Sequence, residues 1–224
     1  MHKVPTHFDR VAVVYPWLEQ AVFGTALNRA RASSLPAART AQSVLLVGEG
    51  NGRFLHHLLP ALRSGCRVTV ADSSAGMLRA AARRCRARRG DVDVAFLHAD
   101  ARRLPELGVP FDLIVTHFFF DLYEPRSQAA VIAGVTRNAA KRAVWCDVDF
   151  VEAPPRRFQR SLMWVQYRFF RVVTGLEATR LHDPRPLFEQ HAWKARSDTL
   201  QRRGMVRVRC WERCLDERLV PVHV

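Results

Sequence analysis

The chain has 224 residues, of which 48% are hydrophobic. It is long enough for one α/β domain with a complete core, and too apolar for a disordered protein. The formal net charge is +14, so an anionic partner such as nucleic acid or a lipid surface stays open. We see no secretory signal, and no apolar run reaches the roughly 20 residues of a membrane span. We therefore expect a cytoplasmic protein without a transmembrane segment.

The first 40 residues contain an amphipathic pattern over roughly residues 15–32, which predicts a helical segment that caps the domain. From residue 41 to 150, short apolar runs alternate with helical periods. This alternation predicts a mainly parallel sheet with helices on both faces. The expected strands are 44–47, 66–72, 92–100, 111–120 and 142–150, and the expected helices are 53–62, one capped by Ser73 or Ser74, and 128–138.

Beyond residue 150 the pattern changes. Residues 151–180 are rich in aromatic side chains and follow two prolines that suit a first helical turn, so we expect a lid helix. This helix packs on the sheet, lines an apolar acceptor pocket or touches a membrane surface. A short helix at 186–190 follows, and the alternating runs 193–201 and 205–214 predict an antiparallel hairpin with its turn at 202–204.

These elements form a single domain over residues 1–224. Its parts are an N-terminal cap segment (1–40), a cofactor-binding core (41–150), the lid helix (151–180) and a hairpin region (181–224). The predicted architecture is a Rossmann-like, seven-stranded, mainly parallel sheet with a C-terminal antiparallel hairpin.

A glycine-rich turn, "GEGNG", joins the first strand to the first core helix. Gly48, Gly50 and Gly52 allow a tight bend and close approach of the backbone to a ligand. The third glycine comes one residue earlier than in the nicotinamide fingerprint, and no Gly-Lys-Ser/Thr follows. A P-loop is therefore excluded, while a dinucleotide site and glycines that serve packing alone remain as alternatives.

Acidic residues end the next two strands. Asp72 stands 20 residues after Gly52, and Asp100 ends the third strand. In an open parallel sheet, ligands bind outside the carboxyl ends of the strands. A carboxylate at Asp72 can accept both ribose hydroxyls, and one at Asp100 can accept a purine amine. Ribose and purine without a clear pyrophosphate cradle indicate an adenosyl group, although either acid can also serve as a turn cap.

At these motifs the chain resembles the class I S-adenosylmethionine-dependent methyltransferases. "LLVGEGNGRF", "VTVADSSAGML", "FLHADARRLP" and "FDLIVTHFFFDLY" are similar to the family's first four motifs, and "FDRVAVVYPWLE" to its cofactor-closing segment. The resemblance covers nearly the whole chain, and the end of the fourth strand is similar to that of small bacterial members. Two positions depart from the pattern: Pro16 and Leu46 each replace a usual acid.

The resemblance implies S-adenosyl-L-methionine as the cofactor. The residues that it implies for cofactor binding are Tyr15, Gly48, Glu49, Gly50, Gly52, Asp72, Ser73, Met77, Asp100, Ala101 and Thr116. Asp100 would lie near the adenine amine, with Ala101 supplying a backbone contact. Glu49 would take over part of the contact with the methionyl ammonium from the missing acid at Leu46.

The chemistry expected is in-line transfer of a methyl group to O, N or S of a small, apolar or aromatic acceptor. His117, after the fourth strand, is the first candidate for the base because an unperturbed imidazole titrates near neutral pH. Asp121 and Tyr123 lie on the same loop and are further candidates. A histidine that only hydrogen-bonds a loop is the alternative for His117.

Two other functions stay open. The basic surface allows an RNA or other nucleic-acid methyltransferase, although the loop used by base-amine methyltransferases is absent. The alternative to a nucleic-acid surface is that "RAAARRCRARRG", residues 79–90, is the solvated end of a helix. An adenosyl-binding protein without methyl transfer is the other function. We expect no metal site, five reduced cysteines, and a monomer or homodimer.

Overall fold

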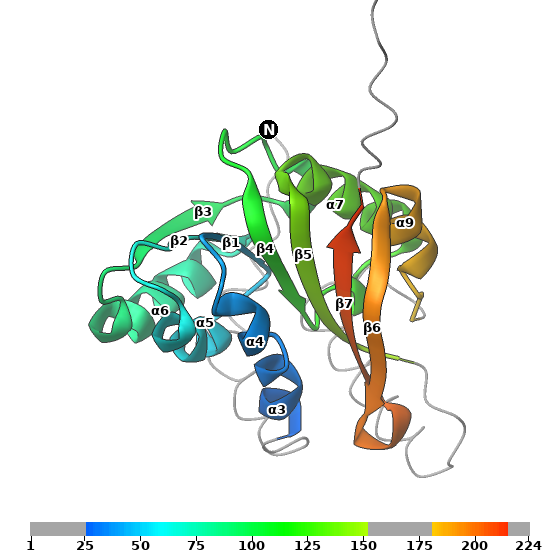
Figure 1. Cartoon of the computed structure of the whole chain (residues 1–224), viewed down its shortest axis with the longest axis horizontal. Helices are drawn as coiled ribbons and strands as arrows, with labels where there is room; N and C mark the ends of the chain where they lie inside the picture. Colours follow the sequence, from blue (N-terminus) through cyan, green and yellow to red (C-terminus); the bar gives the residue numbers. More distant parts are fainter. Residues whose placement is uncertain (1–25, 152–180, 215–224) are drawn as a thin grey trace, which may run out of the picture.

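The computed structural model describes residues 26–151 and 181–214. In this part of the chain, seven strands form one sheet in the order β3-β2-β1-β4-β5-β7-β6 (Figure 1). The strands are β1 Ser43–Val47, β2 Arg67–Asp72, β3 Asp93–His98, β4 Phe111–His117, β5 Ala139–Phe150, β6 Trp193–Gln201 and β7 Val206–Arg213. The first five strands pair in parallel, and β7 pairs antiparallel with β5 and β6. The predicted Rossmann-like sheet and its terminal hairpin are confirmed.

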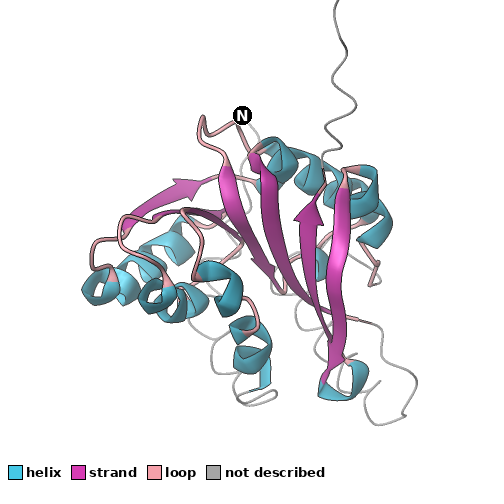
Figure 2. Cartoon of the chain, viewed as in Figure 1, coloured by secondary structure: helices cyan, strands magenta, loops and turns pink. Residues whose placement is uncertain are grey.

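Helices cover both faces of the sheet (Figure 2). The helices are α3 Ala26–Ala32, α4 Leu35–Ala38, α5 Arg53–Leu58, α6 Ala75–Cys85, α7 Pro125–Arg137 and α9 Arg185–Gln190, and short 3-10 turns are η1 Leu59–Ala61, η2 Arg86–Arg88, η3 Ala101–Arg103, η4 Phe120–Leu122 and η5 Arg202–Gly204. Helices α4 to α6 contribute to one core cluster, and α7 and α9 to another. The strand order reverses between β1 and β4, which are neighbours, and ligands bind at such a point in folds of this type.

The two core layers follow the two-residue period of β1. Val44 and Leu46 pack with α5, whereas Leu45 and Val47 face the layer that contains α7. All five residues of β1 are buried, as expected for a parallel strand covered on both faces. This burial holds the glycine turn that follows β1 on a rigid strand.

Several boundaries differ from the sequence prediction for local reasons. Strand β3 ends at His98, two residues early, because Asp100 caps the turn η3. Strand β4 ends at His117 because Phe118 has a φ of 52°, which an extended strand does not allow. Helix α5 ends at Leu58 and continues as the 3-10 turn η1, which contains Pro60.

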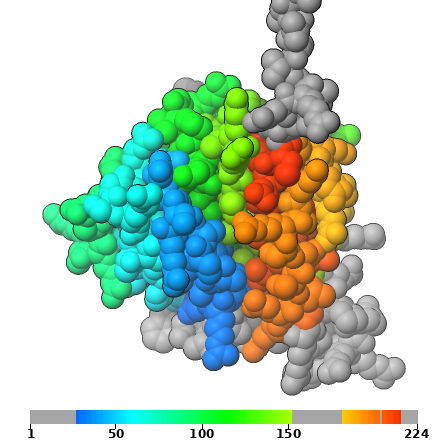
Figure 3. Space-filling view, in the orientation of Figure 1, coloured from blue at the N-terminus to red at the C-terminus, as the bar shows by residue number. Residues whose placement is uncertain are grey.

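The N-terminal cap is described only from residue 26, where α3 begins, and the predicted lid helix lies outside the described residues. Figure 3 shows α3 and α4 lying beside the β6–β7 hairpin on one face of the molecule. Within residues 26–151 and 181–214, no helix is long and apolar enough to cross a bilayer.

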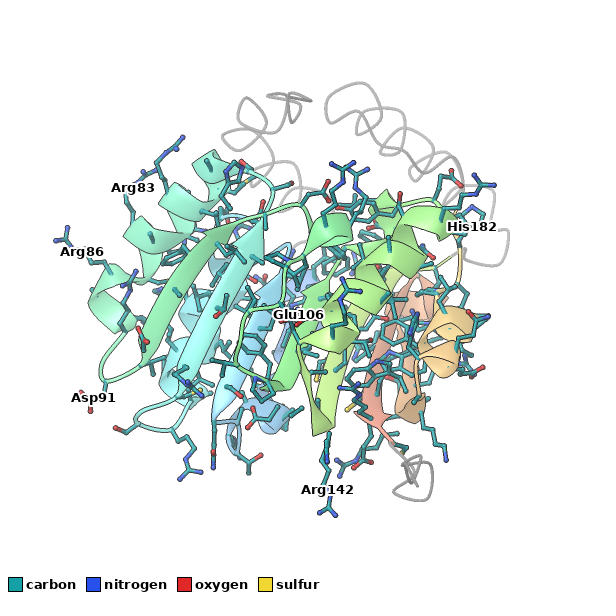
Figure 4. All side chains as sticks on the ribbon, turned by 90° about the horizontal axis from the view of Figure 1, so that it is seen from above. Arg83, Arg86, Asp91, Glu106, Arg142 and His182 are labelled. Atoms are coloured by element: carbon teal, nitrogen blue, oxygen red, sulfur yellow. The ribbon has the colours of Figure 1, made fainter. Side chains whose placement is uncertain are left out.

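The arginine-rich block lies at the end of α6 and in η2. Arg83 and Arg86 are exposed, and Figure 4 shows their side chains extending away from the ribbon. Cations here also favour the negative C-terminal end of the helix dipole. The structure therefore places this block at a solvent-exposed helix end, and binding of an anionic partner there stays a separate question.

Candidate active site

The carboxyl ends of β1 and β2 meet at the glycine turn. The backbone N–H of Gly50 donates to Oδ2 of Asp72 over 2.9 Å, and the N–H of Ser74 donates to Oδ1 over 2.9 Å. Burial raises the pKa of Asp72, against the two backbone hydrogen bonds, which lower it. The turn and the acid predicted for one cofactor are thus directly joined.

Two of the three glycines are explained by packing. A Cβ atom on Gly48 would lie 2.3 Å from the ring of Phe119, and one on Gly52 would lie 2.7 Å from Cα of Ala81. Gly50 is different, because it has a φ of 68° and a Cβ there would meet no atom of the described residues within 4 Å. Beside Asp72, Gly50 therefore presents backbone that no described side chain covers, as close approach of a ligand requires.

Glu49 faces the start of α5. Its Oε1 accepts the backbone N–H groups of Phe54 over 2.8 Å and Leu55 over 3.0 Å. In dinucleotide sites these helix N-terminal groups bind the pyrophosphate. Since a carboxylate already occupies them, the turn fits an adenosyl group without a pyrophosphate. Burial raises the pKa of Glu49 to about 7, although nearby Arg31 opposes the shift.

The other predicted cofactor residues surround this turn. Ser74, rather than Ser73, caps α6 and accepts the N–H of Met77 over 3.1 Å. The carbonyl of Ser73 accepts a hydrogen bond from His98 over 2.9 Å.

Asp100 and Ala101 follow β3 at the neighbouring strand end. The side chain of Asp100 caps η3 and pairs with Arg102 over 2.6 Å. Ala101 is buried. Asp100 therefore already has a cation partner, and a purine amine there would compete with Arg102. Tyr15 lies outside the described residues.

Thr116 points into the layer that contains α7. Its hydroxyl accepts the indole N–H of Trp145 over 2.9 Å and lies 3.4 Å from Oδ1 of Asp147. The side chain is completely buried. It therefore holds the end of β4 against β5.

His117 points into the opposite layer. Its Nε2 lies 2.9 Å from the hydroxyl of Ser34, and its ring packs edge-on against Phe54. Nδ1 is buried and has no hydrogen-bond partner among the described residues. Burial, assisted by Arg31, lowers the pKa of His117 well below its ordinary value. The ring is therefore a neutral imidazole inside the protein at neutral pH.

Asp121 lies beside an acid that the sequence analysis missed. The side chains of Asp121 and Asp149 are hydrogen-bonded to each other, so one of them carries a proton. Asp149 also accepts the backbone N–H of Phe120 over 2.6 Å, which ties the end of β5 to η4. Burial raises the pKa of Asp121 to about 6 and that of Asp149 well above its ordinary value. Tyr123 packs against Phe119, with ring centroids 5.1 Å apart.

Asp147 is a second acid that the sequence analysis missed, and it forms a buried ion pair near the acid pair. Asp147 on β5 pairs with Arg209 on β7 over 2.7 Å, and both side chains are almost completely buried. The alternation "DVD" places Asp147 and Asp149 on one face of β5, directly after the apolar run 143–146. Two acids at this spacing within a buried strand were the sequence feature that could have indicated these site residues. Among the described residues, no group of three His, Cys, Asp or Glu could hold a metal ion.

Comparison with known proteins identifies the family and supports the fold. The family model described as "Methyltransferase domain" matches residues 44–155, half of the chain. No curated protein matches. Among solved structures, the mitomycin 7-O-methyltransferase MmcR superposes with a TM-score of 0.66 at 16% identity, over 92% of this chain and 60% of that one. This chain thus spans about three fifths of the length of MmcR.

Two further structures contain S-adenosylhomocysteine. The N-methyltransferase NodS from Bradyrhizobium japonicum WM9, in complex with S-adenosyl-l-homocysteine, has a TM-score of 0.58 at 14% identity, over 84% of this chain and 87% of that one. Magnesium protoporphyrin IX methyltransferase (ChlM) from Synechocystis PCC 6803, with bound SAH, has a TM-score of 0.60 at 16% identity, over 84% and 82%. At these identities the likeness shows the fold alone. The family match spans the glycine turn, Asp72 and the acid pair, and this chain belongs to the methyltransferase domain family, as its resemblance to the class I S-adenosylmethionine-dependent enzymes predicted.

Proposed function

We propose that this chain binds S-adenosyl-L-methionine and transfers its methyl group to O, N or S of a small, apolar or aromatic acceptor. The observation that carries the proposal is the joined pair of Gly50 and Asp72, with bare backbone on one side and a fixed carboxylate on the other. When bound, the cofactor supplies a methyl group made electrophilic by a sulfonium.

The residues of the turn would hold the two ends of the cofactor. Asp72 would accept the ribose hydroxyls, because its carboxylate is fixed by two backbone donors at the tip of β2. Glu49 would hold the methionyl ammonium, which favours the ionised carboxylate. Asp100 and Ala101 would border the purine from the end of β3.

The Asp121–Asp149 pair is the proposed proton acceptor. Two carboxyl groups that share one proton keep one basic oxygen near neutral pH, and Oδ1 of Asp121 is buried without a hydrogen-bond partner among the described residues. A positioned base of this kind is worth about 10²- to 10⁴-fold in rate. His117 supports the proposal less well, because its ring is held by Ser34 and Phe54 in the other layer.

The aromatic side chains around η4 support an apolar acceptor. Phe119 and Tyr123 pack together beside Gly48 and Asp121. Aromatic faces exclude water and favour a sulfonium cation.

Nucleic acid is a weaker candidate for the acceptor. The exposed arginines stand at the C-terminal end of α6, whose 11 residues begin directly after Asp72 and its cap, Ser74. At about 1.5 Å per residue, α6 carries them roughly 16 Å away from the strand tips. A nucleic acid held by these arginines would thus lie away from the proposed site of methyl transfer.

The first experiment is calorimetric titration of the purified protein with S-adenosylmethionine and S-adenosylhomocysteine, preceded by mass spectrometry of any copurified nucleoside. One-to-one binding is expected. Absence of binding to either compound would refute the proposal. A screen of phenols, amines and thiols as methyl acceptors then tests transfer, and binding without turnover would favour an adenosyl-binding protein.

A further inference from the structure

A cavity lies on the face of the sheet that α3 and α4 cover, near the terminal hairpin. Its volume is about 480 Å³, and its lining includes Ser34, Thr40, Cys146, Arg196, Gln201 and Cys210. Figure 3 shows the blue α3–α4 segment beside the orange hairpin in this region. None of the lining residues belongs to the glycine turn or to the Asp121–Asp149 pair. The methyl transfer proposed above does not use this cavity.

Two cysteines of the cavity wall face each other across neighbouring strands. Cys146 on β5 stands directly opposite Cys210 on β7 in the antiparallel register. Each thiol lies close enough to shift the pKa of the other, upward for Cys146 and downward for Cys210. Cys146 is buried, whereas Cys210 is partly exposed. Cys210 can therefore meet a small molecule in the cavity, while Cys146 lies buried next to it.

The surroundings favour ionisation of the exposed member. The hydrogen bond from Cys146, assisted by the positive charge of Arg196, lowers the pKa of Cys210 to about 7 against the effect of burial. The same hydrogen bond, together with burial, raises the pKa of Cys146 well above its ordinary value. Cys146 thus keeps its proton and donates it to the sulfur of Cys210.

We propose that Cys146 and Cys210 form a redox-reactive thiol pair that reacts with low-molecular-weight disulfides entering this cavity. The thiolate of Cys210 attacks one sulfur of the disulfide, forms a mixed disulfide and releases one thiolate. Cys146 then loses its proton to solvent and attacks the sulfur of Cys210, which releases the second thiolate. The two protein thiols are oxidised, the small disulfide is reduced to two thiols, and electrons balance.

The register allows a bond between the two sulfurs. Directly opposed residues of an antiparallel pair have Cα atoms about 4.5–5.5 Å apart, within the range of about 4.4–6.8 Å that a disulfide spans. Cys210 is partly exposed, and exposed disulfides are reduced readily by small thiols. We therefore expect the bond to be reversible.

The pair is also connected to the end of β4. The hydroxyl of Ser34 hydrogen-bonds both the thiol of Cys146 and Nε2 of His117, the latter over 2.9 Å. Ser34 also lowers the pKa of Cys146. Ser34 therefore links the thiol pair to His117 at the end of β4. Oxidation removes the Cys146 thiol from this link.

The test uses the full chain and oxidised glutathione as the probe. After incubation, free thiols are trapped with iodoacetamide and peptides are mapped by mass spectrometry. A Cys146–Cys210 disulfide that dithiothreitol reverses is expected, with Cys66 and Cys85 remaining reduced because both are buried. If Cys210 stays reduced while exposed Cys214 is modified, the proposal is wrong.

A variant separates the two thiols. In Cys146→Ala, glutathione should remain attached to Cys210, because no second thiol can displace it. Alkylation of Cys210 at pH 7 should also slow by about threefold, because the lower thiolate fraction outweighs the gain in intrinsic nucleophilicity. Cys66→Ala, which removes a buried thiol elsewhere, is the control and should leave both results unchanged. An unchanged alkylation rate in a folded Cys146→Ala protein would show that Cys146 does not lower the pKa of Cys210. If that variant does not fold, peptide mapping of the native chain still decides the proposal.

Discussion

Asp72 binds the backbone N–H of Gly50 with one carboxylate oxygen and that of Ser74 with the other, at 2.9 Å in both cases. Asp112 makes the same kind of double contact at the opposite end of the sheet, with the N–H groups of Gln42 and Ser43 at 2.9 and 3.0 Å. Each of the two carboxylates thus accepts two backbone N–H groups, but the two acids lie at opposite ends of the sheet. Only Asp72 lies at the carboxyl ends of the strands.

This match gives a controlled test of cofactor binding. Asp72→Asn should weaken binding of S-adenosylmethionine by about 1–3 kcal/mol, because a hydrogen bond to a charged group is lost. Asp112→Asn should leave affinity unchanged and lower only the free energy of unfolding. Calorimetry and urea denaturation of both variants check this, and equal affinities for the two variants would exclude the role of Asp72.

The acid pair predicts a pH profile. Because burial raises the pKa of Asp121 to about 6, the rate of methyl transfer should rise as pH increases through 6 and then level off. Asp121→Asn should lower kcat by about 10²-fold or more and abolish this rise. His117→Gln should keep the rise. The profiles are measured with the acceptor found in the screen, and loss of the rise only in His117→Gln would assign the base to His117.

Glu49 predicts a pH-dependent stability. Its folded pKa of about 7 lies above the ordinary value of 4.5, so the folded state binds the proton more tightly than the unfolded chain. Stability therefore falls as pH rises from 4.5 to above 7, by about 3 kcal/mol in total. The glutamine of Glu49→Gln does not titrate, so this variant does not lose stability in that way. The difference in free energy of unfolding, variant minus wild type, should therefore increase by about 3 kcal/mol between pH 4.5 and pH 8.

Urea denaturation at several pH values measures the change. Glu106→Gln is the control, because Glu106 is exposed in the segment between η3 and β4 and is labelled in Figure 4. The control should retain the pH dependence of the wild type. If Glu49→Gln showed the same pH dependence of stability as the wild type, the raised pKa of Glu49 would be contradicted.

The glycine turn predicts unequal costs for two identical substitutions. Gly52→Ala would bring its Cβ within 2.7 Å of Cα of Ala81, at a φ of 79°. Backbone strain and overpacking together should cost about 2–5 kcal/mol. Gly50→Ala has a similar φ, and its Cβ would meet no described atom within 4 Å, so its cost should be only about 1–2 kcal/mol. Thermal or urea unfolding compares the two, and similar losses would show that α6 moves away easily.

Two ion pairs that differ in burial predict different losses. Arg209→Met leaves the buried carboxylate of Asp147 without its partner and should destabilise the protein by about 3–5 kcal/mol. Arg102→Met removes a pair with Asp100 whose side chains are 37% and 26% exposed, and should cost about 0–1 kcal/mol. Urea denaturation measures both, and a loss below 1 kcal/mol for Arg209→Met would show that Asp147 is readily hydrated.

Local patterns in the sequence determined the layered fold and half of the site. The alternation of apolar strands with helical periods predicts the sheet and its covering helices, because burial on both faces requires that pattern. Gly48, Gly50 and Gly52 followed by Asp72 lie within one strand–turn–helix–strand unit. Their meeting therefore depends only on short-range geometry.

Only the tertiary structure decided which distant side chains meet. Asp121 meets Asp149, Asp147 meets Arg209, and Cys146 meets Cys210 because β5 lies between β4 and β7 in a particular register. A strand pattern states which residues face the core, but a shift of one residue would exchange the faces and partners of all these side chains. The acid pair and the thiol pair both follow from that register.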